Sequence, residues 1–161
     1  GAGHSIKEAQ HRGVDPSRLV FAKRLSASEH LARHRLADLF LNTFNYNAHT
    51  TASDALWAGL PLVTKLGEGF AARVAGSLLN AAGLPELVTD SEQTYEALAL
   101  ELALDRGKLQ RIKAKLAANT LSAPLFDTEG FARHLETAYD HAYQRYLDDE
   151  APANINVQRT P

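Results

Sequence analysis

The chain has 161 residues, of which 45% are apolar and 22% are charged, as in an ordinary soluble globular domain. Its formal net charge of −2 argues against binding that depends on nucleic-acid phosphates, so we expect no nucleic-acid partner. No segment approaches the roughly 18 apolar residues of a membrane span, and there is no cysteine. Both features fit a cytoplasmic protein without a membrane partner, disulfides or thiolate metal sites.

The N-terminal stretch GAGHSIKEAQ lacks the apolar core of a signal peptide. A natural chain begins with methionine and this one contains none, so we expect a processed product or a fragment of a longer protein.

Residues 5–89 alternate between helix and strand signals. In chain order we expect a helix over 5–12, a strand over 18–22, a helix over 26–36, a strand over 38–42, a helix from 50 or 51 to 59, a strand over 61–65, a helix over 70–82 and a strand over 85–89. The first two helices carry Ser5 and Ser26 as N-caps, and glycines follow helix ends at 13, 59 and 83.

After residue 90 the pattern is helical only. Helices are expected over 92–105 and 108–119, and a longer one over 128–147 has Phe131, Leu135, Ala138, Tyr139 and Ala142 on one stripe. We interpret residues 1–149 as part of one ligand-binding lobe and residues 150–161 as a disordered tail.

Short apolar strands that alternate with helices predict a Rossmann-like α/β fold, in which helices cover both faces of a parallel sheet. Such folds bind their ligands beyond the carboxyl ends of the strands, where helix N-termini converge. The second expected strand ends at Asn42, so the loop that follows it lies at this edge.

That loop leads into the stretch NAHTTASDALWAG, which is rich in hydrogen-bonding groups. A helix that begins near Thr50 or Thr51 offers unpaired backbone N–H groups and the positive end of its dipole to a phosphate, and His49 can donate a further hydrogen bond. Asp54 lies one turn further on a similar face, where a carboxylate could accept two ribose hydroxyls. Together these groups suit a nucleotide.

Ordinary helix capping explains part of the same pattern. In this alternative Thr51 is the N-cap and Asp54 completes a capping box at the third helical position. The residues alone favour neither interpretation.

A second polar group lies on the helix over 26–36. His30 falls in its first turn and Arg33 follows one turn later, so both should face the same sheet edge. His30 and His34 are also spaced like a pair of metal ligands, but no third ligand has matching spacing, so we do not favour a metal site.

The stretches RLVFA, EHLARHRLADLFLNTFNYNAHTTASDALWAGLPLVT, GEGFAARVAGSLL and SAPLFDTEGFARHLE resemble the C-terminal catalytic lobe of the O-linked N-acetylglucosamine transferases, including their bacterial members and the plant SPINDLY-like proteins. The resemblance runs from about residue 14 to residue 146. It implies the C-terminal, donor-binding lobe of a GT-B glycosyltransferase with a helical C-terminal extension.

The resemblance also implies roles for single residues. Thr50 and Thr51 match the threonines on the donor diphosphate, with His49 beside them, and Asp54 matches the carboxylate on the ribose. His30 and Arg33 match a histidine and an arginine against the uridine. A lysine near the ribose of the animal enzymes is Ala27 here, and Asn42 replaces an aspartate.

The family transfers N-acetylglucosamine from UDP-GlcNAc to serine or threonine hydroxyls of proteins, with inversion and without a required metal or other cofactor. The implied partners are thus a nucleotide sugar and a protein acceptor. The family's catalytic residues lie on a preceding lobe, with tetratricopeptide repeats upstream, so none is expected in this chain.

Two other functions stay open at this point. The chain could be a truncated, non-catalytic remnant that serves as an interaction module, an alternative that the absent lobe, Ala27 and Asn42 motivate. It could also belong to another GT-B enzyme of nucleotide sugars, such as an epimerase.

Overall fold

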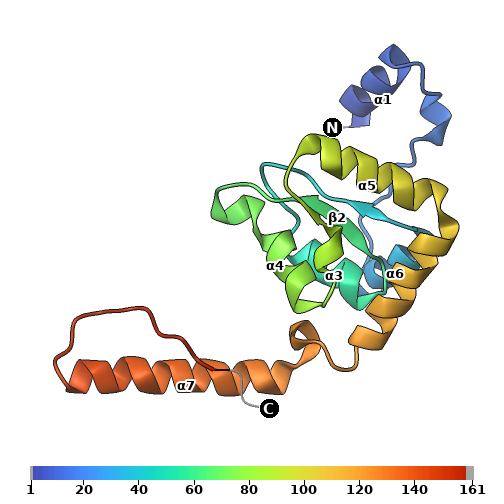
Figure 1. Cartoon of the computed structure of the whole chain (residues 1–161). Coiled ribbons are helices and arrows are strands. Elements are labelled where there is room, and N and C mark those ends of the chain that lie inside the picture. Colours follow the sequence, from blue (N-terminus) through green and yellow to red (C-terminus); the bar gives the residue numbers. More distant parts are fainter. Residues whose placement is uncertain (1, 159–161) are drawn as a thin grey trace.

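The computed structural model describes residues 2–158 of the chain. A parallel sheet with helices on both faces forms the body, an N-terminal segment lies apart from it, and a long helix projects from its other end (Figure 1). The helices are α1 (Ala2–His11), α2 (Ala27–Arg33), α3 (Thr50–Trp57), α4 (Val74–Ala81), α5 (Glu92–Leu104), α6 (Arg106–Asn119) and α7 (Thr128–Leu147). Short 3₁₀ turns are η1 (Pro16–Arg18), η2 (His34–Leu36), η3 (Phe70–Ala72), η4 (Pro85–Leu87) and η5 (Pro124–Phe126).

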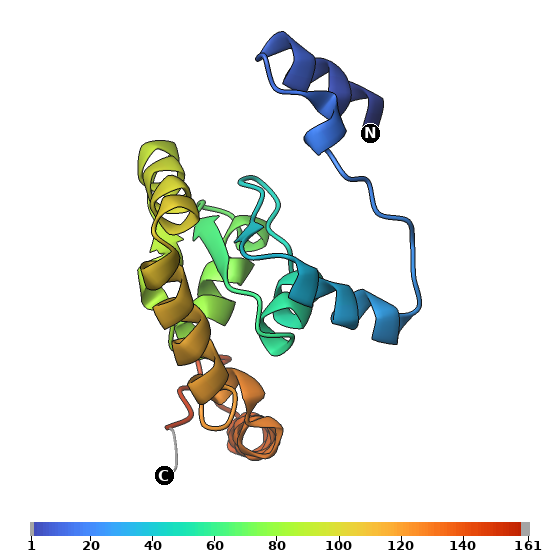
Figure 2. The same ribbon diagram turned by 90° about the vertical axis from the view of Figure 1, so that its right-hand side faces the viewer.

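The sheet has the order β1-β2-β3, with β1 at Phe40–Leu41, β2 at Leu62–Lys65 and β3 at Val88–Thr89. Both pairings are parallel; Phe40 lies opposite Leu62, and Thr64 lies opposite Val88. Helices α3 and α4 connect successive strands and cover one face, whereas α5 and α6 cover the other (Figure 2). All three carboxyl strand ends therefore meet at one edge.

The core lies on both sides of β2. Leu62 and Val63 are fully buried, and leucines from α3, α4, α5 and α6 pack around them: Leu56, Leu79, Leu102 and Leu116. Burying one such leucine side chain contributes about 1.5–3 kcal/mol, so this cluster holds the three layers together and fixes the sheet edge in space.

Glycines end α3 and α4 as the sequence predicts. Gly59 and Gly83 adopt φ values of +83° and +75°, which side chains with a Cβ rarely adopt. After α3 the amide of Leu60 donates to the carbonyl of Ala55 at 2.8 Å, the longer hydrogen bond of a Schellman motif. The tight exit turns the chain directly into β2.

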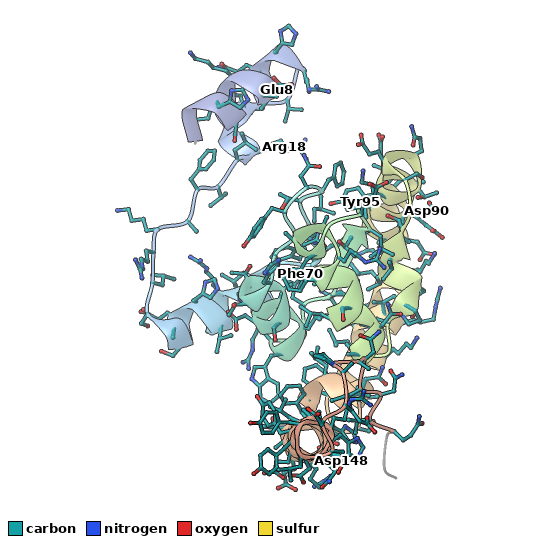
Figure 3. All side chains as sticks on the ribbon, turned by 90° about the vertical axis from the view of Figure 1, so that its left-hand side faces the viewer. Glu8, Arg18, Phe70, Asp90, Tyr95 and Asp148 are labelled. Carbon is teal, nitrogen blue, oxygen red and sulfur yellow. The ribbon has the colours of Figure 1, made fainter. Side chains whose placement is uncertain are left out.

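Two sequence predictions near the N-terminus are wrong. Helix α1 begins at Ala2, so Ser5 lies inside the helix and does not cap it. The apolar run over residues 18–22 forms no strand, and Val20 is 89% exposed. A strand needs a neighbouring backbone for its hydrogen bonds, and this run lies in an extended connection away from the sheet (Figure 2). Glu8 and Arg18 mark this separate segment in Figure 3.

Helix α7 has the bounds that the sequence predicts, but its apolar stripe is largely uncovered. Phe131 and Tyr139 are 66% and 65% exposed. Residues 151–158 have no helix or strand and run back beside α7 (Figure 1). The domain boundary at residue 149 and the disorder of the tail stay predictions.

Among the described residues, no helix combines the length and the apolar character needed to cross a membrane. The cytoplasmic location stays a prediction.

Candidate functional site

The candidate site lies where β1 and α2 meet the first turn of α3, at the carboxyl edge of the sheet. Residues 42–49 connect β1 to α3, and α2 reaches the site through His30, which lies next to Asp54 of α3. Within this region the structure brings together His30, His49, Thr50, Thr51 and Asp54, which the sequence places on two separate segments.

Helix α3 begins without a side-chain cap. Its N-cap residue is His49, whose side chain makes no capping hydrogen bond, while the His49 carbonyl accepts from the amides of Ala52 and Ser53 at 3.1 Å. The first-turn amides of Thr50 and Thr51 have no carbonyl within the helix to bond. They point out of the helix N-terminus together with the positive end of its dipole.

This geometry excludes the capping alternative from the sequence analysis. Thr50 is the first helical residue, so Thr51 lies inside the helix and is not the N-cap. Asp54 is then the fifth helical residue, too far along to complete a capping box. The side chains of Thr51 and Asp54 therefore make no capping hydrogen bonds at the helix N-terminus.

Asp54 faces the second helix of the site. Its Oδ2 lies 4.0 Å from His30 Nε2, and the two side chains are 33% and 27% exposed. The pair is thus partly buried yet open to a ligand. A carboxylate here can accept hydroxyl hydrogens, and an imidazole beside it can contact a base or a second hydroxyl.

Arg33 orients His30. Its Nη2 lies 2.7 Å from His30 Nδ1, and its Nη1 donates to the carbonyl of Lys23 at 2.9 Å. A guanidinium can only donate, so His30 Nδ1 is the acceptor and the ring proton lies on Nε2, toward Asp54. In the structure Arg33 thus contacts the histidine directly.

His34 bonds back to α2. Its Nδ1 lies 2.8 Å from the His30 carbonyl, and the residue is buried. The two rings meet edge to face at 4.7 Å. Within residues 2–158 no cluster of three or more histidine, cysteine or acidic side chains is placed to hold a metal ion.

His49 lies between two exposed aromatic rings. Tyr46 stacks on it at 4.9 Å between centroids, and Phe70, labelled in Figure 3, meets it edge to face at 6.0 Å. His49 Nε2 lies 3.4 Å from the carbonyl of Ala71. These contacts hold the imidazole beside the helix end, where the sequence predicts it to accompany the threonines.

The N-terminus of α2, unlike that of α3, is capped by side chains. Ser26 and Glu29 form the predicted capping box: Ser26 N donates to Glu29 Oε2 at 3.1 Å, and Glu29 N donates to Ser26 Oγ at 3.4 Å. Hydrogen bonds from the Ser26 side chain and backbone lower the pKa of Glu29. Ala27 is the first residue of this helix and supplies no charge.

Two contributors to the site were not predicted. The side chain of Asn42 accepts a hydrogen bond from the amide of Ala48 in the loop. The hydroxyl of Tyr95 in α5 donates a hydrogen bond to the Asn42 carbonyl at 3.0 Å. Burial raises the pKa of Tyr95, so its phenol stays protonated and keeps donating. Asn42 stood out in the sequence only as a departure from the family pattern, and nothing in the sequence linked it to Tyr95.

The fold and this site define a Rossmann-like α/β lobe with an open helix N-terminus at the carboxyl edge of its sheet, a class of domain suited to phosphorylated ligands. The sequence model of glycosyl transferase family 41 matches residues 1–135. The chain therefore belongs to glycosyltransferase family 41.

Curated relatives agree with this assignment. The probable UDP-N-acetylglucosamine–peptide N-acetylglucosaminyltransferase SEC of Arabidopsis thaliana is 39% identical over 150 residues, which are 92% of this chain and 15% of that protein. The corresponding transferase of Caenorhabditis elegans is 40% identical over 146 residues, or 91% of this chain and 13% of that protein. The chain thus spans only a small part of these relatives.

A solved structure of an O-GlcNAc transferase mutant from Thermobaculum terrenum superposes with a TM-score of 0.86 at 33% identity, over 93% of this chain and 29% of that chain. The predicted fold class is thereby confirmed: a Rossmann-like parallel sheet flanked by helices, as in the C-terminal lobe of a GT-B glycosyltransferase. The roles of His30, Arg33, His49, Thr50, Thr51 and Asp54 stay predictions.

Proposed function

We propose that this chain is the donor-binding lobe of an inverting glycosyltransferase that moves N-acetylglucosamine from UDP-GlcNAc to serine or threonine hydroxyls of proteins. One observation carries the proposal: the uncapped first turn of α3 lies beside the Asp54–His30 pair. Family membership supports it, as do the relatives, which are named as UDP-GlcNAc–peptide transferases.

The donor is held in two parts. The diphosphate lies at the N-terminus of α3, where it accepts hydrogen bonds from the amides and hydroxyls of Thr50 and Thr51. The ribose reaches Asp54 one turn further along, and the uracil lies near His30 and Arg33. This arrangement puts the carboxylate on neutral hydroxyls and away from the negative phosphates.

The chemical step uses the same groups. The acceptor oxygen attacks the anomeric carbon from the face opposite the nucleotide, and the bond from that carbon to the diphosphate oxygen breaks. Negative charge then grows on the leaving diphosphate, where the helix end and the Thr50 and Thr51 hydroxyls stabilise it. The acceptor's proton is taken up by a base outside this chain, on the preceding lobe.

We also propose that no metal ion or other cofactor takes part. The helix dipole and the unpaired first-turn amides supply the positive character that a bound cation would otherwise give the diphosphate. Treatment with EDTA should therefore leave UDP affinity unchanged, as measured by calorimetry; a loss that Mg²⁺ restores would contradict this part of the proposal.

Thermal unfolding with ligands tests the main proposal. In the full-length protein, UDP at about one hundred times its Kd should stabilise the fold by about 2.7 kcal/mol and raise Tm, whereas GDP and CDP at the same concentration should have smaller effects. If millimolar UDP gives no shift, the nucleotide assignment is wrong.

Product analysis separates the alternatives. Labelled UDP-GlcNAc with a serine- or threonine-containing protein should yield a labelled acceptor and free UDP. Binding of UDP without any transfer would favour the non-catalytic remnant, and a changed sugar without an acceptor would favour another GT-B enzyme.

A further inference from the structure

Asn42 occupies a central position behind the candidate site. It follows β1, is only 3% exposed, and lies at the start of the loop that ends at His49. The side chain faces the protein interior, so it cannot be a ligand contact. Its hydrogen bonds nonetheless reach the sheet, the site loop and α5.

All four polar groups of Asn42 have partners. The backbone amide donates to the Val63 carbonyl at 3.2 Å, and the backbone carbonyl accepts from Tyr95 Oη at 3.0 Å. In the side chain, Nδ2 donates to Thr64 Oγ1 at 2.8 Å, and Oδ1 accepts from the amide of Ala48 at 2.8 Å. One residue therefore links β1, β2, α5 and the far end of the loop.

The bond to Ala48 closes the loop. Residues 43–47 form a turn that leaves the sheet and returns, and Asn42 Oδ1 holds the returning end at Ala48. Ala48 immediately precedes His49, the N-cap residue of α3. The position of the Ala48 peptide therefore sets where the amides of Thr50 and Thr51 emerge.

The bond to Thr64 fixes the orientation of the Asn42 amide. Thr64 is fully buried in the central strand, and its own carbonyl accepts from Thr89 Oγ1 at 3.0 Å. With Nδ2 bound to this rigid strand, Oδ1 is directed at Ala48. These bonds anchor the loop to β2, the best-packed strand of the sheet, and not to the short strand β1 alone.

We propose that Asn42 is a positioning residue for the diphosphate: its side-chain amide sets the place of the first turn of α3 and thereby the affinity for the ligand. The identity of that ligand rests on the proposed function. A leucine of similar size would make neither side-chain bond. An aspartate could keep both: one carboxylate oxygen would accept from the Ala48 amide, and the other would accept from the Thr64 hydroxyl once that hydroxyl has rotated.

The test compares Asn42→Leu and Asn42→Asp in the full-length protein, with Asn119→Leu as a matched control. Asn119 also makes a partly buried amide bond, from Nδ2 to the Ala82 carbonyl at 2.8 Å, but far from the site. A merely structural role would lower Tm in Asn42→Leu and Asn119→Leu alike, with UDP affinity measured well below Tm unchanged in both.

A positioning role gives a different result. Asn42→Leu should weaken UDP binding by about 10- to 100-fold, because misplacement of contact groups by about 1 Å has effects of this size. Asn42→Asp should restore affinity to within about threefold, and Asn119→Leu should lower Tm without changing affinity. Unchanged UDP affinity in folded Asn42→Leu overturns the proposal.

Thr64→Val keeps the test decisive if Asn42→Leu does not fold. This isosteric change removes only the bond that orients Asn42, and should weaken UDP binding by about two- to tenfold. Wild-type affinity in this variant would equally overturn the proposal.

Hydrogen exchange at the Ala48 amide separates this proposal from the proposed function. The amide should be protected in the wild-type protein without ligand, exposed in Asn42→Leu and protected again in Asn42→Asp. If UDP does not bind the wild-type protein, the proposed function fails while this exchange pattern still supports the positioning role; unchanged protection in Asn42→Leu would refute it.

Discussion

Helices α2 and α3 both contribute residues to the candidate site, yet their N-termini are built in opposite ways. At α2, Ser26 and Glu29 bond each other's backbone amides and close the helix end. At α3, His49 makes no capping bond, and the first-turn amides remain available. The difference indicates that the first end serves the fold, whereas the second is left for a ligand, so changes at the two ends should have separable effects.

The largest effect should come from the open end. Thr51→Val removes one hydroxyl donor from the diphosphate while keeping the side-chain shape. Since loss of a single donor of this kind costs about 10²–10³-fold in rate, transfer from UDP-GlcNAc by the full-length enzyme should fall by that factor in steady-state assays. Thr137→Val, on α7 and outside the candidate site, is the control and should keep full activity. Full activity in Thr51→Val would contradict the site.

Asp54→Asn tests the ribose contact one turn further along α3. Hydrogen bonds to a charged group contribute about 1.5–3 kcal/mol, so UDP affinity should fall by about 10- to 100-fold in calorimetric titrations. The wild-type protein should also bind 2′-deoxy-UDP more weakly than UDP, and this preference should shrink in the variant. An equal preference in both proteins would place the ribose elsewhere.

At the closed end the expected change is in stability. Ser26→Ala removes the cap of α2 and should lower the free energy of unfolding by about 1 kcal/mol in urea titrations. UDP affinity should change less than about twofold, because the cap contacts no ligand. A tenfold loss of affinity would show that the two ends are not separable.

The smallest effect concerns pH. Hydrogen bonds from Ser26 hold the folded-state pKa of Glu29 below its unfolded value of about 4.3. A lowered pKa means that the carboxylate stabilises the fold above that value, and that this contribution is lost as pH falls through the folded pKa. The urea midpoint of the wild-type protein should therefore drop slightly more between pH 7 and pH 3 than that of Glu29→Gln. A parallel pH dependence would contradict the capping assignment.

Local patterns predicted the helices well. The capping box at Ser26, the exits at Gly59 and Gly83, and the bounds of α7 are all present, because caps, glycines and apolar periodicity act within a few residues. The run over residues 18–22 shows the limit of such signals. Its apolar character is typical of a strand, but only a neighbouring backbone can make it one.

The site was predicted in part for the same reason. The residues of the His49–Asp54 stretch are adjacent in the chain, so their grouping was visible, and the parallel-sheet pattern placed them at the correct edge. Whether the helix end was capped depended on backbone geometry, which is why the capping alternative stayed open. Asn42 was missed because its partners Thr64 and Tyr95 lie 22 and 53 residues away.

By itself the sequence determined the fold class, most of the helices and the choice of the segment over residues 47–59 as the candidate site. These depend on short-range periodicity and on motifs of consecutive residues. Only the tertiary structure decided that α3 starts uncapped, that His30 lies 4.0 Å from Asp54, and that Asn42 holds the loop between them and the sheet. Each of these depends on where backbone and side chains lie in space, and that geometry exists only once the core has fixed the layers.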